Sequence, residues 1–257
     1  MDTEAHREYL SEFAHYLQNA SKLRRGCAVP RRDYRADLVA HISSKGNRLA
    51  QPVVVMAGGG YGAGKTTIVD FLVRAKKVPI ELGAVTGVDY FKAYLPEFSL
   101  LQMLSDGNAS TIVQEESRSL AEETFMRMVE NKMSFGWDSS MTNLSETIHR
   151  ITEAKKNGCK LVLVAVFAPV NVAIRQAMER ARKSRRFAHP DFLPKSHVDF
   201  QGNFKTYVPY FDEVFVFVND GILDSYGKKN PRLIAEKVAS QAELAIYDSE
   251  RFAMFVV

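Results

Sequence analysis

The sequence predicts an α/β fold, a three-layer sandwich in which helices cover both faces of a central parallel sheet. Short runs of apolar, β-branched residues alternate with longer segments of helical periodicity. A glycine-rich turn follows the first of these runs directly. Strands that alternate with helices form parallel sheets, because each helix returns the chain to the beginning of the next strand.

Composition is typical of a globular protein. Of the 257 residues, 46% are hydrophobic and 25% charged, and 34 basic against 30 acidic residues give a net charge of +4. This charge suits an anionic ligand but makes nucleic acid an unlikely partner. The longest apolar run, residues 161–170, is shorter than the roughly 20 residues of a membrane helix, so no membrane partner is expected. Two cysteines, Cys27 and Cys159, and a charged N-terminus predict a cytoplasmic protein.

Residues 1–50 are predicted to form a helical, basic segment that packs on or flanks the core. A helix is expected at residues 4–20, where four apolar side chains have helical spacing: Leu10, Phe13, Ala14 and Leu17. The many arginines and lysines of residues 21–50 indicate either a solvated helical face or a site for a polyanion. Residues 51–257 are predicted to form one domain.

The predicted elements of this domain alternate along the chain. Runs of apolar residues predict strands at 53–57, 84–88, 133–137, 161–167 and 214–218. Helical periodicity predicts helices at about 64–76, 109–131, 145–157, 171–184 and 231–246. The last element of the domain is therefore expected to be a helix.

The glycine-rich turn reads Gly59-Gly60-Tyr61-Gly62-Ala63-Gly64-Lys65-Thr66, followed by Thr67. It fits G-x-x-x-x-G-K-[ST] at every fixed position, between an apolar strand and a helix. Glycines let backbone N–H groups converge on phosphate oxygens, and the helix N-terminus favours negative charge. Lys65 is expected to reach the β- and γ-phosphates, and the Thr66 hydroxyl to bind Mg²⁺. The turn predicts an ATP or GTP site with Mg²⁺ in a P-loop fold, which ATPases, GTPases and small-molecule kinases share. The lack of an N-K-x-D motif argues against a GTPase.

Asp89 follows the second predicted strand. A carboxylate outside the carboxyl end of a parallel strand faces the ligand crevice of such folds. It can accept a proton from an attacking hydroxyl in phosphoryl transfer, a reaction in which positioning matters more than basicity. The alternative is that Asp89 caps the helix that follows.

Further polar groups occur at three places. Glu115 and Glu116 lie on the helix predicted for 109–131, where paired acids are usually solvated. Asp138 follows the third strand and could hold Mg²⁺ through water or orient an acceptor. The arginine-rich stretch at about 178–197 is either a solvated helix end or a lid that neutralises a transferring phosphoryl group. Arginine suits a lid because its planar fork matches phosphate oxygens.

Together these segments resemble the zeta-toxin family of P-loop kinases, from about residue 53 to residue 220. The landmarks are the loop GGYGAGKTT, the D-x-F-[KR] pattern in VDYFKAYLPEF, the segment WDSSMT and the arginine-rich lid. The helix segment QEESRSLAEETF is similar to the family's acceptor-binding helix. One departure is that Ser139 and Ser140 follow Asp138 where the family has Gly-Thr.

The resemblance implies a kinase that transfers a phosphoryl group from ATP or GTP to the sugar 3′-hydroxyl of UDP-N-acetylglucosamine. Asp89 matches the family's general base, and Thr66 and Asp138 are the candidates for binding Mg²⁺. The other implied catalytic residues are Lys65 and the lid arginines, Arg180 or Arg182 together with Arg185 or Arg186. The implied acceptor-side residues are Phe91, Lys92, Glu115, Glu116, Arg118, Asp138 and Thr142. A toxin of this type would have an antitoxin protein as its partner.

Other functions remain open at this stage. Proteins of this fold phosphorylate different acceptors, including NAD and antibiotic hydroxyls, and a polynucleotide hydroxyl is a further alternative. A different class is a nucleotide-gated binding protein that hydrolyses ATP slowly and holds a partner through its basic N-terminal segment. These classes differ in whether ADP release depends on an acceptor.

Overall fold

The computed structural model describes residues 31–103, 109–184, 191–222, 231–239, 241 and 243–256. The chain forms two compact units, residues 1–41 and residues 42–257. Helix α2 (Arg31–Ser43) holds the described part of the first unit and runs into the second. The helix predicted at residues 4–20 lies outside the described residues, so the proposed division into 1–50 and 51–257 stays a prediction.

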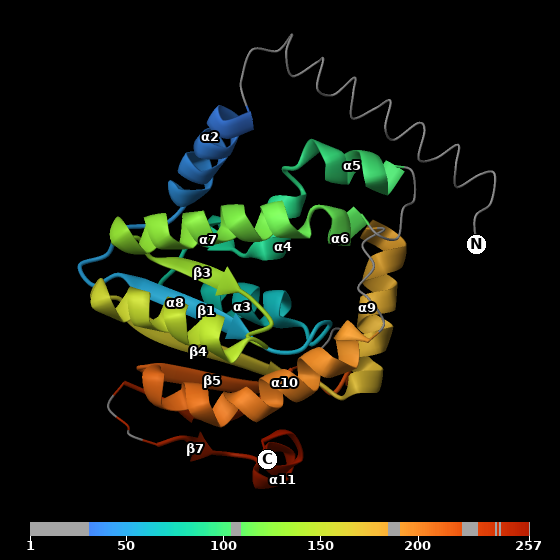
Figure 1. Cartoon of the computed structure of the whole chain (residues 1–257). Helices are drawn as coiled ribbons and strands as arrows, with labels where there is room; N and C mark the ends of the chain where they lie inside the picture. Colours follow the sequence, from blue (N-terminus) through green and yellow to red (C-terminus); the bar gives the residue numbers. More distant parts are fainter. Residues whose placement is uncertain are drawn as a thin grey trace, which may run out of the picture. The chain divides into compact units, whose positions relative to one another are not determined.

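The second unit is built on a sheet whose described strands follow the order β2-β3-β1-β4-β5-β6-β7 (Figure 1). The first five strands of this order pair in parallel. They are β1 (Val53–Gly58), β2 (Val85–Thr86), β3 (Phe135–Asp138), β4 (Lys160–Phe167) and β5 (Glu213–Val218). All six residues of β1 are buried, which is why its sequence is apolar throughout instead of alternating. The predicted parallel core is confirmed.

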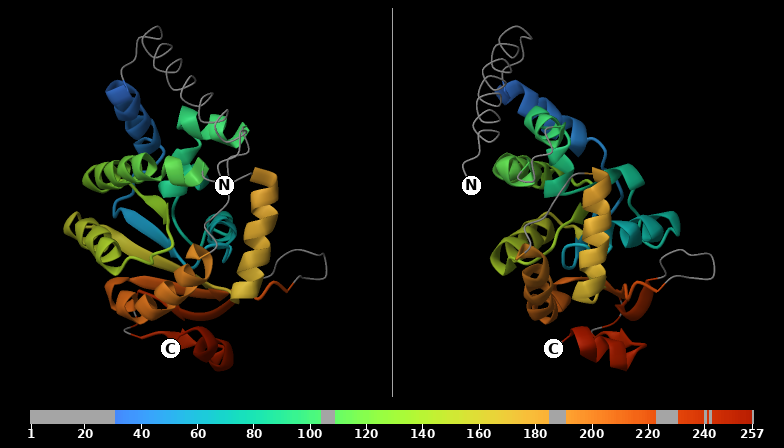
Figure 2. Two further views of the ribbon diagram at one scale, coloured as in Figure 1. Left: turned by 45° about the vertical axis from the view of Figure 1, so that its right-hand side comes forward. Right: turned by 90° about the vertical axis from the view of Figure 1, so that its right-hand side faces the viewer.

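Helices cover both faces of the sheet, as Figures 1 and 2 show. One face carries α3 (Lys65–Arg74), and the other carries α7 (Gln114–Glu130), α8 (Leu144–Lys156) and α10 (Phe192–Tyr207). Helix α9 (Val170–Ser184) follows β4. The shorter helices are η1 (Leu82–Ala84), α4 (Val88–Lys92), α5 (Pro96–Met103), α6 (Ala109–Ile112) and η2 (Val208–Tyr210). This arrangement confirms the predicted three-layer sandwich.

Packing on the two faces fixes the ends of the strands that carry the site. Ile68, Val69 and Leu72 of α3 are buried in one cluster with the side chains of β1 and β4. On the other face, the ring of Phe125 from α7 meets Trp137 of β3 edge to face, with 5.0 Å between centroids. Each buried aliphatic or aromatic side chain contributes about 1.5–3 kcal/mol. The loops at the carboxyl edge of the sheet therefore rest on a rigid base.

The prediction of a helix at residues 231–246 is wrong. This segment contains β6 (Arg232–Lys237) and β7 (Ala245–Ile246), and helix α11 (Ser249–Phe255) comes after them. Strand β6 pairs antiparallel with β5, and β7 pairs antiparallel with β6. The alanine, glutamate and lysine of this segment favour a helix, but the edge of β5 supplies backbone partners that override a weak local propensity.

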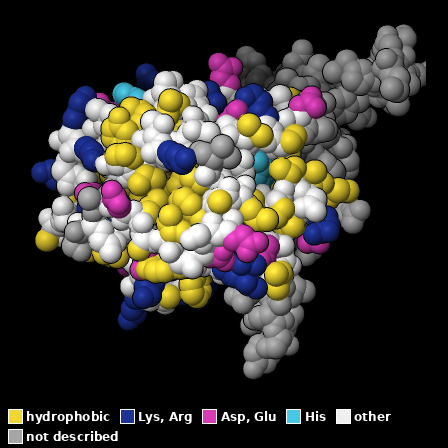
Figure 3. All heavy atoms as spheres, turned by 90° about the horizontal axis from the view of Figure 1, so that it is seen from below, with side chains coloured by type: hydrophobic (Ala, Val, Ile, Leu, Met, Phe, Trp, Pro, Cys, Tyr) yellow, Lys and Arg dark blue, Asp and Glu magenta, His cyan; other side chains and the backbone are white. Residues whose placement is uncertain are grey.

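Strands β6 and β7 form one edge of the sheet, and α11 lies beside them. Figure 3 views the molecule from this side. Hydrophobic side chains gather on this face. Exposed hydrophobic residues of this part of the chain are Leu233 in β6, Ile246 in β7, Tyr247 directly after β7 and Met254 in α11. Among the helices of the described residues, none combines the length and the apolar character needed to cross a bilayer.

Candidate active site

The phosphate loop connects β1 to α3 and depends on glycine at two positions in particular. Gly64 precedes α3 with a φ of 96°, in the left-handed region that favours glycine. At Gly60, an added Cβ atom would lie 2.3 Å from the imidazole ring of His197 on α10. Helix α10 therefore approaches the loop too closely for any side chain at this position. The conformation predicted from the loop's pattern is thus enforced by the structure around it.

Side chains from helix α10 and from Asn219, which follows β5, form hydrogen bonds with backbone groups of the loop. The backbone N–H of Tyr61 donates to the hydroxyl of Ser196 at 2.9 Å, and Nε2 of His197 lies 3.1 Å from the Tyr61 carbonyl oxygen. The amide of Asn219 donates to the carbonyl oxygen of Ala63 at 2.9 Å. Burial lowers the pKa of His197, although its hydrogen bond to Tyr61 opposes the shift. The neutral imidazole is therefore the form that supports the loop.

Lys65 lies beneath the loop. Its Nζ donates to the carbonyl oxygens of Gly59 and Gly60, at 3.0 and 3.3 Å. Burial lowers the pKa of the Lys65 ammonium group. The carboxylates of Asp138 and Asp89 oppose this shift, and the guanidinium of Arg180 adds to it. Asp138, Asp89 and Arg180 come from different elements, yet the charge of each acts on the Lys65 ammonium group.

Thr66 and Asp138 meet across the sheet edge. The Thr66 hydroxyl donates to Oδ2 of Asp138 at 2.8 Å. No cluster of three or more acidic, histidine or cysteine side chains suited to a metal occurs among the described residues. Mg²⁺ does not require one, because it usually takes one or two protein oxygens together with phosphate oxygens and water. A hydroxyl beside a single carboxylate fits this coordination.

Asp89 lies on the short helix α4 and is held by its own helix. Its Oδ1 accepts from the Lys92 ammonium group at 2.8 Å. The Lys92 side chain is 6% exposed, whereas that of Asp89 is 55% exposed and can reach a ligand. Phe91 between them is fully buried and anchors α4 in the core, so it does not line the cleft. The capping alternative for Asp89 is wrong, because Gly87 occupies the N-cap position.

Arg180 is the predicted lid residue that the structure brings to the loop. Its guanidinium carbon lies 4.3 Å from the centre of the Tyr61 ring, a cation–π contact. Phe192 meets the same ring edge to face at 6.3 Å. The side chain of Arg182, and Arg186 altogether, lie outside the described residues. The movement expected of a lid stays a prediction.

One cleft of about 1170 Å³ joins these groups. Lys65, Thr66, Asp89, Asp138 and Arg180 all contribute to its wall. Its other lining residues from the predicted sets are Tyr61, Gly62, Gly64, Thr67, Lys92, Arg118 and Thr142. Gly59, Gly60 and Ala63 are not part of this lining.

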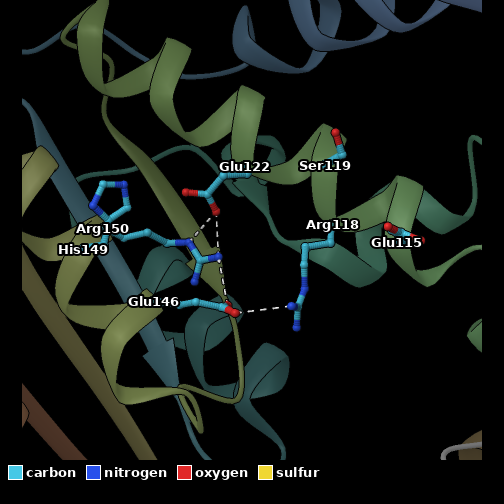
Figure 4. A pocket seen from close by; sticks show the side chains of 7 residues that line it. All are labelled: Glu115, Arg118, Ser119, Glu122, Glu146, His149 and Arg150. Carbon is cyan, nitrogen blue, oxygen red and sulfur yellow. Dashed lines mark hydrogen bonds and ion pairs between the residues drawn. The ribbon is translucent and has the colours of Figure 1, made fainter.

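A second cavity of about 460 Å³ opens beside the cleft between α7 and α8 (Figure 4). Arg150 is nearly buried and donates from Nε and an Nη to one oxygen of Glu122, at 2.8 and 2.7 Å. Arg118 pairs with Glu146 at 3.3 Å. Glu115 lines this smaller cavity, whereas Glu116 lines neither. The structure thus separates the two acids that the sequence placed together.

Sequence reasoning missed several residues that shape the site. They belong to no motif and act through contacts between distant segments: Glu146, Arg150, Ser196, His197 and Asn219. Among them, His197 supports the phosphate loop through its contact with the Tyr61 carbonyl oxygen. The one available signal was the absence of a side chain at Gly60, which indicates a close approach without naming the partner.

Solved structures with the same fold include a protein complex and a toxin–antitoxin system. The AvrRxo1-ORF1:AvrRxo1-ORF2 complex has a TM-score of 0.66 and 18% identity, covering 88% of this chain and 72% of the other. A second structure of that complex, described with ATP, has a TM-score of 0.65 at 18% identity, with the same coverage. The PezAT toxin–antitoxin system of Streptococcus pneumoniae has a TM-score of 0.59 at 13% identity, over 73% of this chain and 75% of the other.

The comparison with curated proteins finds no match for this chain. At these low identities, the structural matches establish the fold. The model of the Zeta toxin family matches residues 38–231, most of the chain, including the phosphate loop, Asp89, Asp138 and Arg180. The protein therefore belongs to the zeta toxin family and has the three-layer α/β fold of P-loop kinases.

Proposed function

We propose that this protein is an ATP-dependent kinase that phosphorylates a hydroxyl group of a nucleotide-sugar such as UDP-N-acetylglucosamine. The observation that carries the proposal is the single cleft lined by Lys65, Thr66, Asp89, Asp138 and Arg180. A nucleotide-binding loop alone would serve hydrolysis or binding equally well. An exposed carboxylate in the same cleft adds a group suited to an acceptor hydroxyl.

The nucleotide end of the cleft follows from the loop. Its backbone N–H groups and Lys65 would bind the phosphates of ATP or GTP, with Thr66 and Asp138 holding Mg²⁺. Bound there, Mg²⁺ supplies positive charge that neutralises the phosphate oxygens. Lys65 would exchange its hydrogen bonds with the Gly59 and Gly60 carbonyls for phosphate oxygens. Such exchange gives the buried ammonium group charged partners in place of neutral carbonyls, which favours binding.

The transfer step assigns a task to each side chain. The oxygen of the acceptor hydroxyl attacks the γ-phosphorus atom while Asp89 accepts the proton of that hydroxyl. The bond from the γ-phosphorus to the β–γ bridging oxygen breaks, and ADP is released. Lys92 holds the Asp89 carboxylate in place. Arg180, whose guanidinium stacks on the Tyr61 ring, would stabilise charge on the transferring group. The lid of residues 178–197 would supply further arginines.

Membership of the zeta toxin family supports a nucleotide-sugar as the acceptor and an antitoxin protein as a partner. The PezAT relative is described as a toxin–antitoxin system. The cleft volume of about 1170 Å³ leaves room for an acceptor beside ATP. On its acceptor side, Arg118 and Thr142 remain the proposed contacts, together with Lys92 and Asp138.

An acceptor panel tests the function. ADP release with Mg-ATP would be measured with UDP-N-acetylglucosamine, other UDP-sugars, NAD, an aminoglycoside and a short oligonucleotide. We expect rapid release with one acceptor and its loss, by about 10²- to 10⁴-fold, in the Asp89→Asn variant. That variant should still bind a fluorescent ATP analogue like the wild type.

Two outcomes would contradict the proposal. Release that is slow and independent of every acceptor would favour a nucleotide-gated binding protein. Acceptor-dependent transfer at the wild-type rate in Asp89→Asn would remove Asp89 as the base. Asp70→Asn is the matched control, because Asp70 also lines the cleft but has no proposed role in the transfer step.

A further inference from the structure

Two tyrosines of the cleft wall, Tyr90 and Tyr94, share a lysine partner that no motif singles out. The Lys45 ammonium group donates to the Tyr90 hydroxyl at 2.8 Å and lies 3.5 Å from the Tyr94 hydroxyl. The two hydroxyl oxygens are 3.0 Å apart. The three polar atoms thus form a compact triangle, called here the Lys45–Tyr90–Tyr94 cluster.

The cluster lies next to the proposed base. Tyr90 directly follows Asp89 on α4, and both tyrosines line the same cleft as Asp89. Tyr94 comes four residues after Tyr90, so the two rings lie on one side of the chain, 5.4 Å apart. A molecule whose hydroxyl meets Asp89 would therefore present its neighbouring groups to the cluster.

Lys45 gives the cluster its positive charge, and its contacts within the cluster are the hydroxyls of the two tyrosines. The hydrogen bond from Lys45 to Tyr90 raises the pKa of Lys45 despite partial burial, and no described carboxylate contributes to that shift. Burial would raise the pKa of Tyr90, but hydrogen bonds with Lys45 and Tyr94 outweigh it and lower that pKa. The raised pKa keeps Lys45 an ammonium group near neutral pH, beside the two tyrosine hydroxyls. Ammonium and hydroxyl groups are hydrogen-bond donors, and together they favour an anion.

We propose that the Lys45–Tyr90–Tyr94 cluster binds a phosphate group of the acceptor while Asp89 engages the hydroxyl to be phosphorylated. This inference rests on the proposed kinase function. A lysine ammonium is a point charge suited to phosphate oxygens, and phenol hydroxyls add directed hydrogen bonds. An acceptor without a phosphate would lose these contacts, so the cluster would select phosphorylated compounds, including nucleoside diphosphate sugars.

Matched acceptors and variants test this site. The Michaelis constants of UDP-N-acetylglucosamine, N-acetylglucosamine 1-phosphate and N-acetylglucosamine would be compared, along with any acceptor that the panel identifies. In Lys45→Met, we expect KM for phosphorylated acceptors to rise about tenfold or more, while KM for ATP and for a neutral acceptor stays unchanged. Lys45→Arg should restore most of the affinity. Lys205→Met is the control, because Lys205 is exposed on α10 and no described contact links it to the two tyrosines.

A binding measurement separates this inference from the kinase proposal. With the nucleotide site saturated by a non-hydrolysable ATP analogue, the affinity of UDP would be measured calorimetrically for the wild type and for Lys45→Met. We expect at least tenfold weaker binding in the variant. Tyr90→Phe and Tyr94→Phe, which keep the packed rings, should each weaken UDP binding and test the cluster if Lys45→Met fails to fold.

Each result has a definite meaning. Equal UDP affinity in the wild type and all three variants would overturn the inference, even where the wild type is an active kinase. Equal loss of affinity for neutral and phosphorylated acceptors would also overturn it, because the cluster would then only shape the cleft. Absence of acceptor-dependent transfer in the wild type would instead contradict the kinase function itself.

Discussion

The Thr66 hydroxyl donates to Oδ2 of Asp138 at 2.8 Å, joining two residues that are 72 positions apart in the chain. Thr66 is the second residue of α3, and Asp138 is the last residue of β3. Strands β1 and β3 are adjacent and parallel, so the loop after β1 and the end of β3 meet at one edge of the sheet. This contact places side by side the two oxygen groups that we propose as ligands for Mg²⁺.

The Thr66–Asp138 pair predicts a metal-dependent loss of affinity. Thr66→Val or Asp138→Asn should weaken Mg-ATP binding about tenfold to a hundredfold and reduce its dependence on Mg²⁺, because each removes an oxygen contact. Thr66→Ser, which keeps the hydroxyl, is the matched control. Fluorescent-nucleotide titrations with and without Mg²⁺ would check this, and unchanged Mg²⁺ dependence in both variants would contradict it.

Lys65 should show opposite effects on stability and on binding. Because burial disfavours its ammonium group, Lys65→Met should melt at the wild-type temperature or above. The same variant should lose nucleotide affinity, since no cation would remain beneath the loop. Thermal unfolding and nucleotide titration of the same samples measure both effects. A lowered melting temperature would show that the loop carbonyls depend on Lys65 for their structure.

The ion pair of Lys92 with Asp89 predicts an effect on the rate of transfer. Lys92→Met frees the carboxylate to rotate, so kcat should fall about tenfold or more, because misplacing a reacting group is costly. Stability should change little, since Asp89 is 55% exposed and water can replace its partner. Lys92→Arg should retain most of the rate. A wild-type kcat in Lys92→Met would show that Asp89 needs no support.

Arg180 should act on transfer more than on binding. Arg180→Met removes a cation placed over Tyr61, and we expect kcat to fall about 10³-fold, the effect typical of an arginine that neutralises a transferring phosphoryl group. Arg175→Met is the control, because Arg175 is exposed on the same helix and does not line the cleft. Steady-state kinetics would decide, and equal effects of the two substitutions would remove Arg180 from the site.

His197 predicts a loss of stability in mild acid. Its pKa lies below the ordinary 6.5 because it is buried, so the unfolded chain takes up a proton before the folded chain does. The free energy of unfolding should therefore fall as the pH drops below about 6.5, until the pKa of the folded state is passed. His197→Gln keeps an N–H donor but cannot titrate, and it should show a shallower decline between pH 7.5 and 5.5 in urea titrations. Identical declines would exclude His197 as the cause.

The site shows how far local pattern reaches. The phosphate loop and the D-x-F-K segment could be predicted because their chemistry lies within eight or fewer consecutive residues. In the second segment, one stretch of chain supplies the exposed carboxylate, the buried Phe91 and the partnering Lys92. Spacing alone did not distinguish Glu115 from Glu116, because only the packing of α7 against α8 places one of them at a cavity.

The sequence by itself determined the alternation of strands and helices, the phosphate loop and the residues that most define its chemistry. Buried parallel strands and glycine-rich turns leave local signatures, since each depends on neighbouring residues. The tertiary structure alone decided the pairing of Thr66 with Asp138, the support of the loop by His197 and the strand conformation of residues 232–237. These features depend on contacts between segments far apart in the chain, whose free energy exceeds the weak conformational preferences of single residues.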